Sequence, residues 1–250
     1  IQKCVLNRSG YLYDEPHFLL QQEVSEVGSY FSIIKAIAAG NHKLSTIAAV
    51  LEVKSTNLTK YLKTLMDLDI LERRVPVTEE NPEKSKRGLY KIKDNYLRFW
   101  FAFIYPNMSF IESGHSGIVM DKIRRGLTTS HIGFVYEDIC QERMWELNVN
   151  NAWPFQFSKL GGYWDAKNEI DIAALDPEGK NLILGECKYW KEPVGLNVLH
   201  ALEAKACDVA WERDRRKVWY VLFSISGFSD ELRNHAATRD DLLLIDDGGR

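Results

Sequence analysis

The order of apolar segments in the second half of this 250-residue chain is the strongest constraint on its fold. A helix-like stretch beginning at Gly133 precedes three strand-like segments, after which helix-like and strand-like segments alternate. The strand-like segments are FQFSKLGGYWD, EIDIAAL, LILGECKYW, KVWYVLF and LLLID, and further helices are predicted over 194–210 and 229–238. This order, α-β-β-β-α-β-α-β, predicts a mixed sheet with helices on its faces in a domain spanning residues 133–250.

The helix-like stretch at the start of this domain is GFVYEDICQERMWEL. Its apolar residues Phe134, Ile139, Met144 and Leu147 fall roughly on one side of a helix, which predicts the buried face. Glu137 lies within the same stretch.

The first half of the chain has a different pattern, three short helices followed by a hairpin. After a loop-like start through YLYDEPHF, helices are predicted over 29–39, over 44–51 and from Ser55 onward. The third of them is expected to bury Leu58, Leu62 and Leu65. ILERRVPVTEENPEKSKRGLYKI then contains two strand-like stretches around a polar loop, typical of a β-hairpin. These features predict a winged helix-turn-helix domain over 1–98, so the fold class expected for the whole chain is α/β.

DNA contacts in such a domain would come from the exposed face of the third helix and from the hairpin loop. The candidates are Thr56, Asn57, Thr59, Lys60 and Lys63 on the helix, with Lys84, Lys86 and Arg87 in the loop. Residues 1–98 carry 15 Lys/Arg and 12 Asp/Glu, whereas residues 99–250 carry 17 and 23, so any attraction for phosphate is weak. Generic backbone binding is expected, and the alternative is a domain that contacts only other proteins.

An aromatic-rich segment, YLRFWFAFIYPNMSFIES, follows the predicted hairpin. Pro106 and Asn107 interrupt it, which argues against one long helix. It is too apolar for a flexible linker. We expect residues 99–132 to form a packed connection between the two domains.

Acidic residues gather where two predicted strands are joined by the turn DPEGKN. Side chains alternate along a strand, so Glu169 and Asp171 are expected on one face of the first strand. Glu186 and Lys188 are expected on one face of the next. Because the turn is short, the two faces can coincide and bring the charged groups together.

Converging carboxylates repel one another unless they are protonated or neutralised by a cation. An all-oxygen cluster suits Mg²⁺ or Mn²⁺, which can activate water and stabilise charge on a phosphate. The Glu-x-Lys pair alone is weak evidence, because it also occurs at Glu52/Lys54 and Glu203/Lys205. The interpretation depends on the order of acid, strand, turn, strand, acid and lysine.

Glu137 in a helix, EID ending in Asp171, and ECK with Glu186 and Lys188 together resemble the PD-(D/E)XK, or restriction-endonuclease-like, superfamily. More closely, STNLTKYLKTLMDLDILERRVPVTE, YKIKDNYLRFWFAFIYPN and GECKYW resemble the C-terminal part of archaeal-type P-loop ATPases. The resemblance implies that Glu137, Asp171 and Glu186 are metal ligands and that Lys188 is the catalytic lysine. Glu169 is then an optional further ligand.

The expected function is a DNA-binding nuclease module that hydrolyses phosphodiester bonds with Mg²⁺ or Mn²⁺. The alternative is an inactive arm that binds DNA or regulates through protein contacts. The chain begins at Ile1 and contains no G-x-x-x-x-G-K-[ST] phosphate loop, so the ATPase module is expected elsewhere in a longer protein. No apolar run approaches the roughly 20 residues that cross a bilayer, and no signal peptide is recognisable, so a cytoplasmic location is expected.

Overall fold

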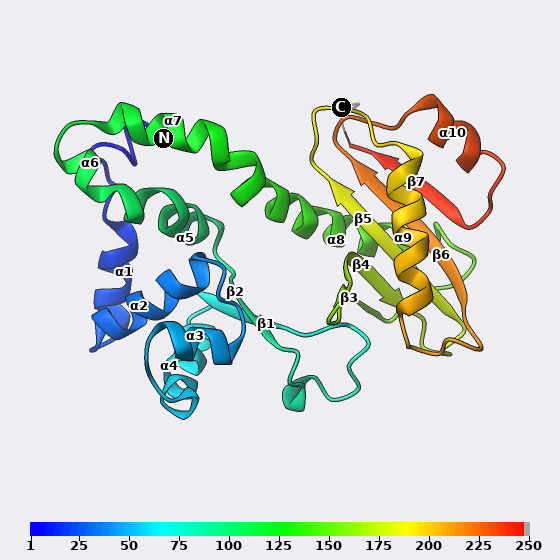
Figure 1. Ribbon diagram of the computed structural model, residues 1–250, viewed down its shortest axis with the longest axis horizontal. Helices are drawn as coiled ribbons and strands as arrows, with labels where there is room; N and C mark the ends of the chain where they lie inside the picture. Colours follow the sequence, from blue (N-terminus) through cyan, green and yellow to red (C-terminus); the bar gives the residue numbers. More distant parts are fainter. Residues whose placement is uncertain (248–250) are drawn as a thin grey trace. The chain divides into compact units, whose positions relative to one another are not determined.

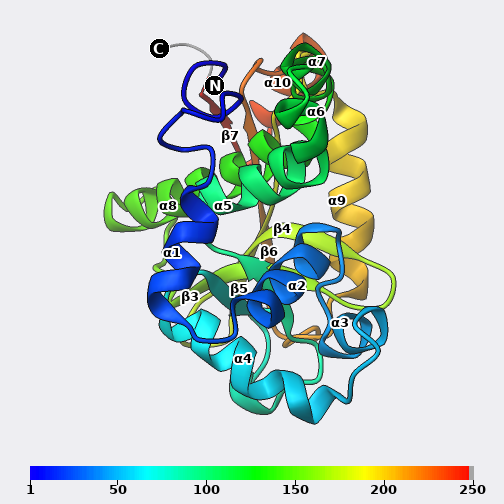
Figure 2. The same ribbon diagram turned by 90° about the vertical axis from the view of Figure 1, so that its left-hand side faces the viewer.

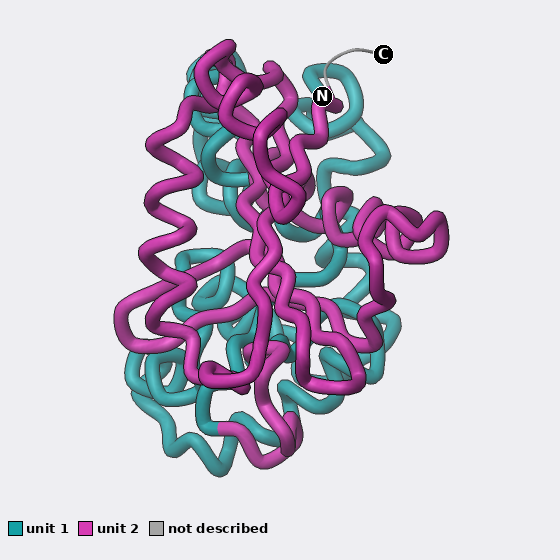
Figure 3. Tube along the Cα trace, turned by 90° about the vertical axis from the view of Figure 1, so that its right-hand side faces the viewer, with its two compact units in different colours: residues 1–74, 86–131 teal, residues 75–85, 132–250 magenta. Residues whose placement is uncertain are grey.

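A computed structural model describes residues 1–247, and the chain divides into two compact units, coloured separately in Figure 3. The first unit comprises residues 1–74 and 86–131, and the second comprises residues 75–85 and the chain from Ile132 onward. These boundaries differ from those predicted. The loop 75–85 belongs to the second unit, and the segment expected as a separate connection belongs almost entirely to the first.

Helices dominate the first unit (Figures 1 and 2). Its leading elements are α1 (Glu15–Glu23), α2 (Val27–Ala38), α3 (Leu44–Val50), α4 (Ser55–Asp67), β1 (Leu71–Arg74) and β2 (Leu89–Ile92). The three predicted helices and the antiparallel hairpin are confirmed, and α4 buries Leu58, Leu62 and Leu65. The stretch expected to be loop-like instead contains the start of α1, where Pro16 occupies the first turn and, like Leu20 further along, is buried.

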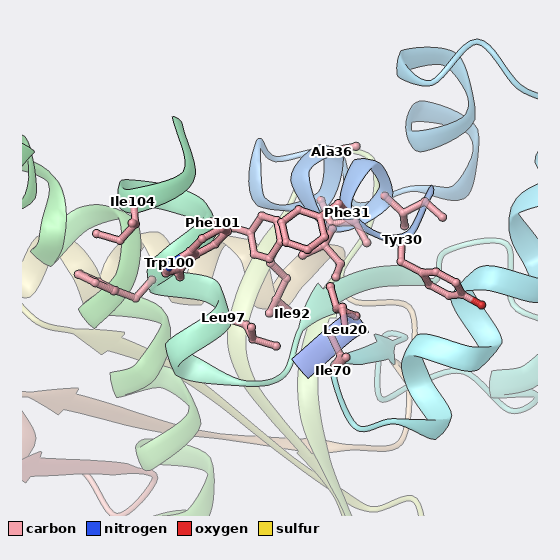
Figure 4. Close-up of a cluster of buried hydrophobic side chains, with 14 of the residues drawn as sticks. Leu20, Tyr30, Phe31, Ala36, Ile70, Ile92, Leu97, Trp100, Phe101 and Ile104 are labelled. Atoms are coloured by element: carbon pink, nitrogen blue, oxygen red, sulfur yellow. The ribbon is translucent and has the colours of Figure 1, made fainter. Parts of the chain in front are cut away.

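The aromatic-rich segment folds into the core of the first unit. It consists of α5 (Asn95–Phe99), a π-helical turn (Trp100–Ile104), a 3₁₀ turn (Tyr105–Asn107) and α6 (Met108–Glu112), followed by α7 (Ser116–Leu127) and a π-helical turn (Thr128–Ile132). The rings of Trp100 and Phe101 lie 6.0 and 5.2 Å from the ring of Phe31 on α2 (Figure 4). The indole N–H of Trp100 also donates to the carbonyl of Tyr13 at 2.8 Å. This packing explains why the segment groups with the first unit.

A five-stranded mixed sheet forms the second unit. Its strands are β3 (Lys159–Trp164), β4 (Glu169–Leu175), β5 (Asn181–Lys188), β6 (Lys217–Ser224) and β7 (Leu242–Asp246), adjacent in that order. β4 pairs antiparallel with both β3 and β5, whereas β6 pairs parallel with both β5 and β7. The helices are α8 (Gly133–Val149), α9 (Leu196–Asp208) and α10 (Asp230–Ala236). The predicted mixed α/β architecture and its element order are confirmed.

Both faces of this sheet are buried, which explains its continuous apolar strands. On one face, which α9 covers in Figure 1, Leu199 and Leu202 of α9 belong to the same core cluster as Leu184 and Leu222. The opposite face is covered by α8, and its core contains Tyr136, Cys140, Met144, Ile172, Ile183 and Phe223. The sheet is thus held between α9 and α8.

The buried face of α8 agrees with the predicted one only in part, because Met144 is buried and Leu147 is half-buried in the same core, as expected, but the other two residues are not. Tyr136, Cys140 and Met144 are buried at four-residue spacing, whereas Phe134 and Ile139 are exposed. This face lies against the sheet because Tyr136, Cys140 and Met144 pack in one core with Ile172 and Ile183 of the strands. α8 has 17 residues, and no helix within residues 1–247 combines the length and apolarity needed to cross a bilayer.

Loop 75–85 packs on the edge of the second unit's sheet. The N–H of Val77 donates to the carbonyl of Gly162 on β3 at 3.0 Å, and the Val77 side chain joins the core on the α9 side. Further along the loop is a short 3₁₀ helix (Pro82–Lys84). β3 is an edge strand of the sheet, and its outer backbone groups would otherwise lack partners. The hydrogen bond from Val77 provides a partner for one of them, the carbonyl of Gly162.

Candidate active site

The β4–β5 hairpin brings the predicted acids together. Ile172 lies opposite Gly185, so Asp171 comes beside Glu186 at the open end of the hairpin. At the closed end, the Asp176 carboxylate accepts the N–H of Lys180 at 2.8 Å and the side-chain amide of Asn181 at 2.8 Å. These turn contacts hold the register that sets the acids side by side.

A β-bulge alters the direction of β4 at Asp171. Gly161 pairs with Ala173 and Tyr163 with Ile170, so Asp171 and Ile172 together oppose the single residue Gly162. A bulge of this kind bends the strand and redirects its side chains. Ile170 and Ala173 accordingly both join the α9-side core, although strict alternation would put them on opposite faces.

The bulge interrupts the pattern that was expected to place Glu169 beside Asp171. Glu169 precedes the bulge, and its side chain is exposed. Only its backbone carbonyl enters the charged cluster, where it accepts from Nζ of Lys205 at 2.8 Å. The structure therefore gives no support to Glu169 as a further carboxylate ligand.

Asp171 is held from two neighbouring elements. Its Oδ2 accepts the backbone N–H of Cys187 at 2.9 Å and lies 3.4 Å from Nζ of Lys188. Its backbone carbonyl accepts from Nε2 of Gln141 on α8 at 3.3 Å. Burial, and then the adjacent charge of Glu186, raise the pKa of Asp171.

Glu186 is almost completely buried, and both of its carboxylate oxygens are paired. Oε2 contacts Nζ of Lys188, and Oε1 lies 2.6 Å from Nζ of Lys205 on α9. Burial opposes ionisation, but the two ammonium groups outweigh it and lower the pKa of Glu186. Glu186 is therefore a carboxylate at neutral pH.

Lys188 lies between the two acids. Burial favours its neutral amine, yet Asp171 and Glu186 outweigh this effect and raise the pKa of Lys188. The group is an ammonium at neutral pH, suited to donating hydrogen bonds and balancing negative charge. It is poorly suited to removing a proton from water, since a general base must be deprotonated to act.

Glu137 occupies the first part of α8, one helical turn before Gln141. With burial, Cys140 and Asp171, its charge helps raise the pKa of the Cys187 thiol well above the usual value. The structure thus brings Asp171, Glu186 and Lys188 into direct contact and places Glu137 on the helix that reaches Asp171 through Gln141.

Two adjacent carboxylates are a donor set that fits Mg²⁺ or Mn²⁺. Mg²⁺ commonly uses one or two carboxylates and completes its coordination with water and substrate phosphate. Within residues 1–247, no group of three or more His, Cys, Asp or Glu is arranged to hold a metal ion, so Glu137 is not grouped with Asp171 and Glu186. Asp171 and Glu186 are therefore the two acids that could hold such an ion, and Glu137 as a further ligand stays a prediction.

Lys205 and Gln141 are members of the cluster that the sequence interpretation did not identify. Lys205 belongs to one of the Glu-x-Lys pairs treated above as chance occurrences. Its position on α9, three residues after buried Leu202 and directly before buried Ala206, puts it at the border of the buried helix face. This spacing from buried residues is the sequence feature that could have indicated Lys205. No comparable sequence feature indicates Gln141.

The predicted DNA-contacting residues of α4 share one exposed face. Thr56, Asn57, Thr59, Lys60 and Lys63 are all exposed. In the hairpin loop, Lys84 and Lys86 are exposed and Arg87 is half-buried. Lys84 belongs to the second unit, whereas Lys86 and Arg87 belong to the first.

Comparison with known proteins identifies relatives without an assigned activity. The sequence model of the DUF234 family, described as archaeal and bacterial proteins of unknown function, matches residues 100–206, a range that includes the acids of β4 and β5. An uncharacterised protein of Methanocaldococcus jannaschii is 39% identical over 192 residues, covering 77% of this chain and 42% of that protein. The chain thus spans less than half the length of this curated relative. No solved structure matches the chain.

Proposed function

We propose that this chain is the DNA-binding, metal-dependent nuclease part of a larger protein. In this proposal the first unit contains a winged helix, and the second is a PD-(D/E)XK nuclease domain that hydrolyses phosphodiester bonds with Mg²⁺ or Mn²⁺. One observation carries it: Asp171, Glu186 and Lys188 meet on two adjacent antiparallel strands, with Asp171 in a β-bulge. These are the residues to which the PD-(D/E)XK resemblance assigns the chemistry.

The roles follow from the charge states of the three groups. A bound divalent ion would supply Lewis acidity and a water of lowered pKa. Asp171 and Glu186 would hold the ion through their carboxylate oxygens. Lys188, protonated and half-buried beside them, would donate to a phosphate oxygen as negative charge builds there. Partial burial strengthens this interaction because it reduces screening by water.

DNA binding is assigned to the exposed face of α4. Lys60 and Lys63 are three residues apart and therefore neighbours on the helix surface, with hydroxyl and amide side chains around them. Such a face suits phosphate and base-edge contacts. α4 follows two short helices and precedes a hairpin, the order in which winged helices present a recognition helix.

The decisive experiment measures cleavage of labelled duplex, single-stranded and four-way-junction DNA with Mn²⁺, Mg²⁺ or EDTA. Asp171→Asn is compared with Glu178→Gln, an exposed acid in the turn of the same hairpin that pairs with Lys180. We expect cutting that requires metal, disappears in Asp171→Asn and persists in Glu178→Gln. Cutting that survives EDTA, or an active Asp171→Asn protein, would contradict the proposed site.

A second function, a non-catalytic DNA-binding arm, is supported by the pairing of Glu186. Both of its oxygens already contact ammonium groups, so the charged cluster is complete as a structural ion-pair network. This alternative expects salt-sensitive DNA binding with no cleavage under any metal condition. The same assay distinguishes the two functions.

The larger protein is part of the proposal. The resemblance to archaeal-type P-loop ATPases places an ATPase module in the same full-length polypeptide, outside this chain, and a cytoplasmic location is proposed with it. The matched archaeal relative is long enough to contain a further domain, because this chain covers 42% of it. ATP hydrolysis by the full-length protein, absent from residues 1–250 alone, is the expected result.

A further inference from the structure

Lys205 of α9 occupies a position that a cation would take beside Glu186. Its Nζ lies 2.6 Å from Oε1 of Glu186 and 2.8 Å from the backbone carbonyl oxygen of Glu169. Both partners are oxygens, one of them a buried carboxylate oxygen. The Lys205 side chain is 30% exposed, whereas that of Glu186 is 6% exposed. The lysine therefore reaches the buried acid from the solvent side.

Charge balance makes Lys205 and a divalent ion competitors. The contacts join two carboxylates, Asp171 and Glu186, to two ammonium groups, Lys188 and Lys205, so the cluster is neutral. A divalent ion added to this arrangement would leave two uncompensated positive charges in a largely buried site, which is strongly unfavourable. One ammonium group has to leave before the ion binds.

The geometry identifies Lys205 as the group that leaves. Lys188 contacts both acids and its side chain is 19% exposed, whereas Lys205 contacts one acid and is more exposed. Lys205 also lies in the last turn of α9, where its long flexible side chain can reach water. With Lys205 withdrawn and a divalent ion bound, the remaining groups carry a single positive charge, complementary to the single negative charge of a phosphodiester.

We propose that Lys205 is a positioning residue that neutralises and orients Glu186 and must release it before a divalent cation binds. The inference rests on the proposed nuclease site and adds a control step to it. Metal binding is coupled to withdrawal of the α9 lysine, so the two carboxylates remain neutralised and ordered until the ion binds. Removing the charge of Lys205 should therefore strengthen metal binding even when no DNA is present.

The test is calorimetric titration of Mn²⁺ into the whole chain without DNA. Lys205→Met retains most of the aliphatic stem and removes the charge, and Lys205→Gln is a second neutral variant should the first fail to fold. We expect each neutral variant to bind Mn²⁺ at least about tenfold more tightly than the unmodified chain, because a competing cation is gone. Lys205→Arg, which keeps the charge, should bind like the unmodified chain. Lys180→Met, at the other end of the hairpin, is the control and should change nothing.

The outcomes separate this inference from the proposed function. If Asp171→Asn abolishes Mn²⁺ binding but the neutral Lys205 variants bind no more tightly than the unmodified chain, the metal site stands and the role of Lys205 is overturned. If no variant shows Mn²⁺ binding that depends on Asp171, the proposed metal site fails and the inference fails with it. Circular dichroism of each variant separates lost binding from lost folding.

Discussion

The backbone N–H of Cys187 donates a hydrogen bond to Oδ2 of Asp171 on the neighbouring strand, with 2.9 Å between nitrogen and oxygen. This bond fixes an acid in the bulge of β4 to the backbone of β5, next to Glu186 and Lys188. A side chain held by the sheet itself is already oriented before a ligand arrives. Preorganisation of this kind is what electrostatic catalysis requires, because no reorganisation is then needed during the reaction.

The proposed nuclease function predicts that replacing Lys188 with Met lowers the DNA cleavage rate by at least about 100-fold, the usual effect of removing one electrostatic donor from a catalytic site. The protein should remain folded, since methionine retains the aliphatic bulk of lysine. Lys180→Met is the matched control, because Lys180 pairs with Glu178 in the turn of the same hairpin, just as Lys188 pairs with Glu186 at the open end. Equal cleavage rates in the two variants would remove Lys188 from the mechanism.

The proposed role of α4 in DNA binding predicts that replacing Lys60 and Lys63 together with Ala weakens DNA binding and reduces its salt dependence. Each phosphate contact contributes about 0.9 to the slope of log affinity against log salt, so a loss of about two in slope is expected. Fluorescence anisotropy at several salt concentrations measures it. The control changes exposed lysines of the second unit, Lys167 and Lys180, to Ala. Unchanged binding in the α4 variant would favour a role for this face in protein contacts.

Replacing Gly185 with Ala should destabilise the second unit. A Cβ at this position would lie 2.6 Å from Cγ1 and 2.9 Å from the carbonyl oxygen of Val221 on β6, closer than side-chain atoms pack. The expected loss is about 1–3 kcal/mol in the free energy of unfolding, as for other overpacked cores. Urea denaturation measures it.

The control for this change is Gly28→Ala on α2, where no atom lies within 4 Å of the added Cβ. Alanine favours the helix there by up to about 1 kcal/mol, so this variant should be neutral or more stable. A Gly185→Ala protein as stable as the unmodified chain would show that β5 and β6 separate easily, and that the position of Glu186 is less constrained than these contacts indicate.

The stability contributed by Asp241 should depend on pH. Arg239 donates from Nε and Nη2 to the two oxygens of Asp241, at 2.8 and 2.9 Å, and lowers the pKa of this carboxyl group. A carboxyl group whose pKa is lower in the folded than in the unfolded protein stabilises the fold above its ordinary pKa of about 3.9. That contribution disappears as the pH falls through the lowered value.

Asp241→Asn should therefore lower the free energy of unfolding by about 1 kcal/mol at pH 7, the upper range for a partly exposed ion pair. The difference from the unmodified chain should stay constant down to about pH 5 and shrink below about pH 4. Denaturation curves at pH 7, 5 and 3 measure it. A difference that does not change with pH would mean that the effect comes from packing and not from ionisation.

Much of the fold was predictable because secondary structure follows local periodicity. The apolar spacing of Leu58, Leu62 and Leu65 defined the buried face of α4, and the short apolar runs between turn signals defined all five strands of the sheet. The order Asp171, turn, Glu186, Lys188 likewise identified the charged cluster, since a tight hairpin brings adjacent antiparallel strands into register. Each of these features depends on residues close together in the chain.

Tertiary structure decided the rest, because it depends on partners far away in the chain. The two-to-one pairing of Asp171 and Ile172 with Gly162 is a property of β3 and β4 together, and the face that α8 buries depends on the sheet it covers. Loop 75–85 likewise groups with the second unit because the backbone N–H of Val77 donates to the carbonyl of Gly162 on β3, a residue far away in the sequence. Lys205 lies 19 residues beyond Glu186, and only the packing of α9 on β5 brings its ammonium group to that carboxylate. Ion pairs of this kind form between side chains that the fold brings together: helical spacing places Lys205 at the border of the buried face, but it does not identify Glu186 as the partner.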